Sequence, residues 1–141
     1  MNAEVMSREG PRESPREAPA TPGPSGAGAA PDSETNERLV RRYFDMWNTG
    51  DGAVADAVLG PTYRDHALPD VVGPAAARSL APRFHAAHPE AQTTIEVTRA
   101  DAEFVAVKRT TRQIEQGQEI VSSGSALFRI ADGKLVEQWS W

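Results

Sequence analysis

The sequence predicts an α+β domain in which N-terminal helices cover one side of a strongly curved, mostly antiparallel sheet. Helical periodicity fills the first part of the folded chain, and strand-like alternation fills the last part. Residues 119–141 read as two long strands joined by Asp132-Gly133, a pair that accepts the positive φ values of a two-residue hairpin turn. Long strands with aromatic and polar residues at alternate positions favour a sheet that bends around a pocket.

The composition is typical of a globular protein with one domain. The chain has 141 residues, 39% of them hydrophobic, and a formal charge of −5. The negative charge argues against a nucleic-acid partner, and no apolar run is long enough to cross a membrane. No apolar leader segment is present, so we expect a cytoplasmic protein. The lack of cysteine excludes disulfides, thiolate catalysis and cysteine-based metal sites.

Residues 1–32 differ from the rest in composition. They are rich in Pro, Gly and Ala and contain few large apolar side chains. Such a segment buries too little apolar area to offset the entropy lost on ordering, so we expect a disordered tail. A dispensable extension is favoured over a docking tail. The folded domain should span residues 33–141.

Helical patterns occupy the chain up to about residue 90. The first helix should begin at Asp32-Ser33, either of which can cap it, and end near Asn48, before Gly50. Its apolar stripe consists of Leu39, Val40, Tyr43, Phe44 and Trp47.

Two shorter helical patterns follow. Asp51 can cap a short helix that ends at Gly60-Pro61, and a third helix begins at Pro74 and ends at His88-Pro89. Pro82 lies inside that third pattern, where it removes a backbone hydrogen bond. We therefore expect a kink there, or two short helices.

Strand patterns occupy the remaining segments. A short strand is expected at 63–67 and a loop at 68–73, followed by strands at 93–100, 104–114, 119–130 and from Lys134 onward. In the closing strand, simple alternation puts Leu135 on the same side as Glu137, Trp139 and Trp141, and Gln138 on the opposite side.

Several segments carry a family resemblance: 43–51 (YFDMWNTGD), 63–66 (YRDH), Gly73, 84–90 (FHAAHPE), 105–110 (VAVKRT) and 128–139 (FRIADGKLVEQW). Together they resemble the SnoaL-like polyketide cyclases, a family of the nuclear-transport-factor-2-like superfamily. The resemblance covers residues 33–141. It implies a cone-shaped sheet wrapped by the helices around a deep apolar pocket, and a homodimer formed through the outer face of the sheet.

The sequence departs from this family at three positions. The aldol cyclases carry a catalytic Asp where this chain has Ala126, and their closing strand reads Glu-His-Trp-Asp where this chain has Gln138 and Ser140. Relatives that hydrolyse epoxides use an Asp-Arg-Asp set. Here Arg109 matches the arginine, but Thr111 and Ser140-Trp141 replace the acids.

The catalytic candidates are His66, Glu137 and Arg109. Adjacent strand residues point to opposite faces, so only one of Asp65 and His66 can face a pocket. His66 has the intrinsic pKa for acid–base work near neutral pH, but a strand-end histidine bonded to the backbone is about equally expected. The pKa of Glu137 would be raised if it were buried among tryptophans.

Arg109 requires a partner if its strand face is turned inward. Glu137 or an anionic ligand could supply that partner, and a structural ion pair or an open sheet face are equally compatible with the sequence.

The expected substrate-binding residues are mainly aromatic: Tyr43, Trp47, Tyr63, Phe84, Phe128, Gln138, Trp139 and Trp141. His85 and His88 share a helix face, but a surface position is favoured over a metal site, so no metal is expected. No glycine-rich phosphate loop follows a strand, so no cofactor is expected.

Taken with the resemblance, these residues predict a cyclase or isomerase of natural-product biosynthesis. Its substrate would be a polyketide-like or similarly hydrophobic intermediate, and its pocket would promote ring closure mainly by proximity, with limited acid–base help. The main alternative is a non-catalytic ligand-binding or dimerisation module. An epoxide hydrolase or dehydratase is less favoured.

Overall fold

The computed structural model describes residues 31–141. The domain described below is the compact unit Ser33–Trp141. The disorder predicted for residues 1–32 falls almost wholly outside the described residues. Within residues 31–141, no helix is long and apolar enough to cross a membrane.

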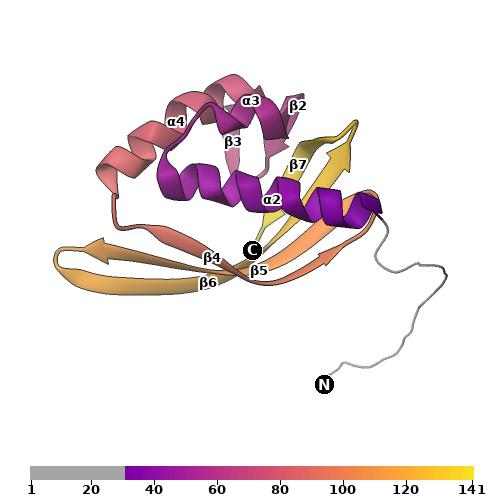
Figure 1. Cartoon of the computed structure of the whole chain (residues 1–141). Coiled ribbons are helices and arrows are strands. Elements are labelled where there is room, and N and C mark those ends of the chain that lie inside the picture. The colour runs from indigo at the N-terminus through magenta and orange to yellow at the C-terminus, as the bar shows by residue number, and fades with distance from the viewer. Residues whose placement is uncertain (1–30) are drawn as a thin grey trace, which may run out of the picture. The chain divides into compact units, whose positions relative to one another are not determined.

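A curved, six-stranded sheet forms one layer of the domain (Figure 1). The strand order is β3-β2-β7-β6-β5-β4. Only β2 and β7 pair in parallel, and all other neighbours are antiparallel. The strands are β2 (Leu59–Asp65), β3 (Leu68–Val72), β4 (Gln92–Ala100), β5 (Phe104–Glu115), β6 (Gln118–Ala131) and β7 (Lys134–Ser140). The predicted α+β class is confirmed, with a bent sheet that does not close into a barrel.

Three helices cover one face of this sheet (Figure 1). They are α2 (Pro31–Thr49), α3 (Val54–Val58) and α4 (Gly73–Ala87). The apolar stripe of α2 packs on β6, where the ring centroids of Tyr43 and Phe44 lie 5.3 and 5.8 Å from that of the fully buried Phe128. Burial of these aromatic rings is the main source of stability at this contact.

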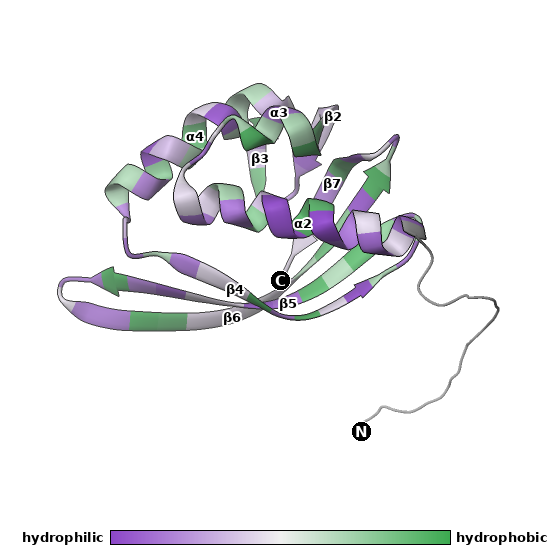
Figure 2. Cartoon of the chain, in the orientation of Figure 1, coloured by the Kyte–Doolittle hydropathy of each residue, from purple (hydrophilic) through white to green (hydrophobic). Residues whose placement is uncertain are grey.

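Not all of the apolar surface is covered. Figure 2 shows hydrophobic segments at the outer end of the β5–β6 hairpin, where Ile114, Ile120 and Val121 are exposed.

The region between α3 and α4 differs from the sequence-based prediction. Residues 68–72 form the edge strand β3 instead of a loop, because Leu68 pairs with Asp65 and Val72 with Arg64 across a tight turn. Strand β2 begins at Leu59, so Gly60-Pro61 lies in a strand and does not end a helix. Pro69 lies in this edge strand. A proline is usually taken to interrupt a strand, so the sequence pattern at 68–72 does not indicate one.

Helix α4 runs through Pro82 as one element, so the prediction of two separate helices is wrong. Pro82 cannot donate a hydrogen bond to the carbonyl of Arg78, one turn earlier. That carbonyl oxygen instead faces Gly52, and it would lie 2.2 Å from a Cβ placed there. The missing side chain of Gly52 therefore allows the α3 turn to pack against the interrupted turn of α4.

A β-bulge in β7 decides which side chains face the helices. Leu135 pairs with Ile130 and Glu137 pairs with Arg129, so Val136 is an extra residue in β7. An inserted residue moves all later side chains to the opposite face. Leu135 is therefore inside, yet Glu137 is outside, which corrects the prediction that these two residues share a side.

We predict that Gly52→Ala lowers the free energy of unfolding by about 1–3 kcal/mol, because the new methyl group overlaps the Arg78 carbonyl. Gly52 is not among the glycines with positive φ, so a loss there arises from the contact and not from backbone strain. Urea unfolding of both proteins measures the difference. Wild-type stability in the variant would contradict the close approach.

Candidate functional site

The inner face of the sheet carries a string of polar side chains. The Tyr63 hydroxyl lies 2.6 Å from Oε1 of Gln138 and 3.3 Å from the Tyr43 hydroxyl. Nε2 of Gln138 donates to Oγ of Ser140 at 3.2 Å. Burial raises the pKa of Tyr43 to about 12 and that of Tyr63 still further, so both phenols stay protonated. The string is therefore neutral at physiological pH.

Arg109 also faces inward, from β5. It pairs across the sheet with Gly124, and its guanidinium lies over that residue, with Nη1 and Cζ 3.6 and 3.7 Å from the position of a Gly124 Cβ. Its Nε is buried and hydrogen-bonds to no atom within residues 31–141. A partly buried guanidinium with a buried, vacant donor is suited to an anionic or strongly polarised oxygen.

Asp65 is the inward-facing residue of the Asp65-His66 pair. Only 4% of its surface is exposed, and it lies opposite Gln138 in the β2–β7 register. Burial raises the pKa of the Asp65 carboxyl, and hydrogen bonds from the backbone N–H groups of Ala67 and Leu68 and the positive charge of Arg109 offset part of that rise. A carboxyl of this kind can accept a proton from a substrate.

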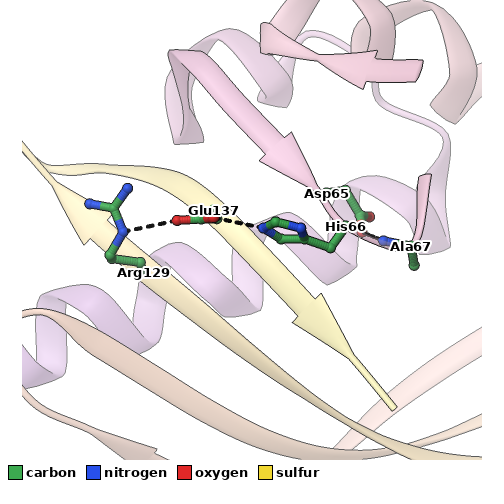
Figure 3. Close-up of polar contacts among 5 residues, drawn as sticks. All are labelled: Asp65, His66, Ala67, Arg129 and Glu137. Atoms are coloured by element: carbon green, nitrogen blue, oxygen red, sulfur yellow. Dashed lines mark hydrogen bonds and ion pairs between the residues drawn. The ribbon is translucent and has the colours of Figure 1, made fainter. Parts of the chain in front are cut away.

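His66 and Glu137 lie on the outer face of the sheet. Nε2 of His66 lies 2.6 Å from one oxygen of Glu137, and Nε of Arg129 donates to the other at 3.2 Å (Figure 3). The His66 ring stacks on Trp139, with centroids 5.2 Å apart. The hydrogen bond to His66, followed by that to Arg129, lowers the pKa of Glu137. The predicted rise in this pKa is therefore wrong, as is the predicted pairing of Glu137 with Arg109.

An apolar cavity of about 430 Å³ opens beside α4. Its lining consists of Trp47, Leu68, Leu80, Arg83, Phe84, Ala87 and His88. The volume lies within the range of small-molecule sites. The Trp47 ring also packs edge-on against Tyr43, with centroids 6.3 Å apart, so the cavity is one aromatic layer from the polar string.

The predicted binding residues thus fall into three places. Trp47 and Phe84 line the cavity. Those buried in the core or on the inner face are Tyr43, Tyr63, Phe128 and Gln138. Trp139 stacks on the outer face, and Trp141, 73% exposed, ends the chain.

The sequence-based prediction missed Asp65 as the inner member of its pair. The signal was present in the alternation that places Asp65 on the same side as Tyr63. His85 and His88 belong to no group of three or more His, Asp or Glu residues within 31–141 that could hold a metal ion.

A comparison with family models matches residues 40–138 to the SnoaL-like domain. The chain belongs to the SnoaL-like domain family. This confirms the predicted resemblance, and the matched segment contains Asp65, Arg109 and Gln138. A search of curated protein sequences found no match.

Solved structures of the same fold include members from several bacteria. A protein of Jannaschia sp. CCS1 classed with the SnoaL-like polyketide cyclases is 22% identical, with a TM-score of 0.69 over 82% of this chain and 90% of that one. An LEH-like epoxide hydrolase of M. tuberculosis is 20% identical, with a TM-score of 0.66 over 78% and 84%. IdmH of Streptomyces antibioticus, a polyketide cyclase candidate, is 15% identical, with a TM-score of 0.62 over 74% and 89%. At these identities the likeness establishes the fold alone.

We predict that Tyr63→Phe lowers the free energy of unfolding by about 1–3 kcal/mol, because Oε1 of Gln138 is left buried without its donor. Adding Gln138→Leu should recover part of that loss, since both partners are then apolar. Urea unfolding of the single and double variants measures the coupling. Strictly additive losses would contradict a direct Tyr63–Gln138 bond.

We predict that Glu137→Gln changes the acid limb of the stability curve. Because its pKa is lowered in the folded protein, Glu137 contributes stability above its usual pKa of about 4.3 and loses it as the pH falls through the lowered value. Unfolding followed from pH 6 to pH 3 should therefore show a shallower decline in the variant. Glu115→Gln controls for the removal of one negative charge, and an equal change in both variants would contradict the prediction.

Proposed function

We propose that this protein is a cyclase or isomerase of natural-product biosynthesis that acts on a hydrophobic, polyketide-like intermediate with an enolisable carbonyl group. One observation carries the proposal. The inner face of the sheet combines a buried carboxyl of raised pKa, Asp65, with the partly buried guanidinium of Arg109, whose buried Nε has no hydrogen-bond partner in the described part of the chain. A base and an oxyanion stabiliser are the two groups that enolisation needs.

In the proposed reaction, Asp65 removes a proton from the carbon beside the carbonyl group, and Arg109 stabilises the negative charge that develops on the carbonyl oxygen. The resulting carbanion carbon then attacks a second carbonyl of the same molecule, which closes a ring and forms an alkoxide. Asp65 returns the proton to that alkoxide. In an isomerisation, the proton returns to a different carbon.

The apolar cavity supports this proposal through proximity. A chain held in a folded conformation in the cavity, against Trp47 and Phe84, places its two reacting carbons close together, which lowers the entropy cost of ring closure. Of the substrate-binding residues proposed from the sequence, Trp47 and Phe84 line the cavity and keep that proposed role. Roles for His66 and Glu137 in the chemistry form the alternative assignment, which the His66→Gln variant below tests. A homodimer and a cytoplasmic location stay predictions.

A non-catalytic binding module of the same fold is the main alternative. Ala126, Gln138 and Ser140 favour it, since none of them exchanges a proton near neutral pH and all three replace ionisable residues of the resembling cyclases. Comparative mass spectrometry of metabolites from the source strain, with and without the gene, decides between the two. A lost product replaced by a compound of equal mass and different retention supports cyclisation or isomerisation. An unchanged profile supports the binding module, and a difference of one water indicates a dehydratase or hydrolase.

With the accumulated compound as substrate, we predict that Asp65→Asn and Arg109→Met each lower turnover by about 10²-fold or more. The matched control is His66→Gln, the neighbour of Asp65 on the opposite face, which should retain most of the activity. Loss of activity in His66→Gln with retention in Asp65→Asn would reverse the assignment in favour of His66 and Glu137.

The pH dependence of turnover gives a separate prediction. A base must be deprotonated to act, and the pKa of Asp65 is raised by burial. Turnover should therefore increase with pH through an apparent pKa above the usual aspartate value of about 3.9. A rate that is independent of pH from 4 to 8, measured under single-turnover conditions, would contradict a role for Asp65 as base.

A further inference from the structure

The hydrogen bonds of the polar string on the inner face run in one direction from donor to acceptor. A tyrosine hydroxyl has one proton, and an amide oxygen can only accept, so Tyr63 donates its proton to Oε1 of Gln138 at 2.6 Å. The contact of 3.3 Å between the two tyrosine oxygens then uses the proton of Tyr43. Because its oxygen is held by Tyr63, the Gln138 amide directs its nitrogen toward Ser140.

Ser140 is the last member of this string. Its Oγ accepts a hydrogen bond from Nε2 of Gln138 at 3.2 Å. Among residues 31–141, no acceptor receives the hydroxyl proton of Ser140. A hydroxyl that already accepts a hydrogen bond is a stronger donor, because each bond in a chain polarises the next. The Ser140 hydroxyl can therefore donate a hydrogen bond to a bound molecule.

Strand register brings Ser140 and Arg109 together. Ser140 pairs with Ala126, Arg109 pairs with Gly124, and the two β6 residues are separated by one position on the same face. Gly124 and Ser140 are therefore diagonal neighbours across β6 and β7, about 7–8 Å apart at the backbone, and the guanidinium of Arg109 reaches over Gly124 from β5, on the other side of β6. Gly124 and Ala126 carry almost no side chain, and the space above Gly124 is shared by the guanidinium and the backbone oxygen of Trp141, which lies 3.2 Å from the position of a Gly124 Cβ.

We propose that Ser140 and Arg109 form a two-donor site for an enolate or phenolate oxygen. The proposal deepens the proposed function, because it names the group of the substrate that the inner face recognises and adds Ser140 as a catalytic residue. Tyr63 and Gln138 act as positioning residues that hold the Ser140 hydroxyl as a donor. An aspartate at position 140 would repel the same oxygen, so a neutral residue suits this site.

The site can be tested without the natural substrate by using 2-naphthol, whose neutral and ionised forms have different absorption and fluorescence spectra. Wild-type protein should bind the probe as naphtholate at pH values where free 2-naphthol is neutral. Ser140→Ala and Arg109→Met should each weaken naphtholate binding about tenfold or more, as expected for hydrogen bonds to a charged group. Both should also raise the apparent pKa of the bound probe.

Three further variants separate a donor role from a structural one. Ser140→Thr keeps the hydroxyl and should bind like wild type. Tyr63→Phe should give a smaller loss than Ser140→Ala, since it acts through Gln138. Ser123→Ala, an exposed serine of β6 that is not in the string, should have no effect. Circular dichroism confirms that each variant is folded before it is titrated.

Binding of the probe only as neutral naphthol, or equal binding by Ser140→Ala and wild type, would overturn the proposed site. Because the probe undergoes no reaction, this outcome is independent of turnover. The two proposals can also fail separately. If the protein binds naphtholate at this site but deletion of its gene changes no metabolite, the proposed function is overturned and the oxyanion site stands.

Discussion

The bulge at Val136 in β7 is the constraint on which the arrangement of polar groups depends. Without the extra residue, alternation from the buried Leu135 would place Glu137 inside and Gln138 outside. With it, Gln138 enters the core and accepts the hydrogen bond from Tyr63, which a buried amide oxygen requires. The same shift places Glu137 outside, where its carboxylate pairs with Arg129 and hydrogen-bonds to His66. One inserted residue thus places the neutral Gln138 in the interior and the charged Glu137 on the outer face.

The interior that results differs from a pocket built around several ionisable groups. Ala126, Gln138 and Ser140 exchange no protons near neutral pH, and the two buried tyrosines hold theirs because burial raises each pKa. Asp65 and Arg109 are the charged groups of the inner face that the proposed chemistry uses. A site with one base and several fixed donors is suited to stabilising a single developing negative charge in a medium of low polarity. The neighbouring apolar cavity supplies the ordering that ring closure needs.

Much of the fold could be predicted from the sequence, because it depends on local periodicity. The α2 stripe ending at Gly50 and the hairpin at Asp132-Gly133 were identified from side-chain spacing and turn chemistry. The site was harder to predict, because a bulge leaves no reliable mark on the sequence. Simple counting through Val136 therefore put Glu137 on the wrong side and gave its pKa the wrong direction. The sequence marks Arg109 as an inward candidate. Its neighbour Gly124, and the lack of a hydrogen-bond partner for its Nε within residues 31–141, depend on strand pairing between distant residues.

The most direct test of this account is the accessibility of consecutive positions in β7, for which the chain is well suited because it contains no cysteine. Single Glu137→Cys and Gln138→Cys variants would be treated with a maleimide under native conditions and again in denaturant. The account predicts rapid labelling at position 137 in the folded protein, and labelling at position 138 only after unfolding. Faster native labelling at position 138 than at position 137 would contradict the bulge and, with it, the assignment of the inner face.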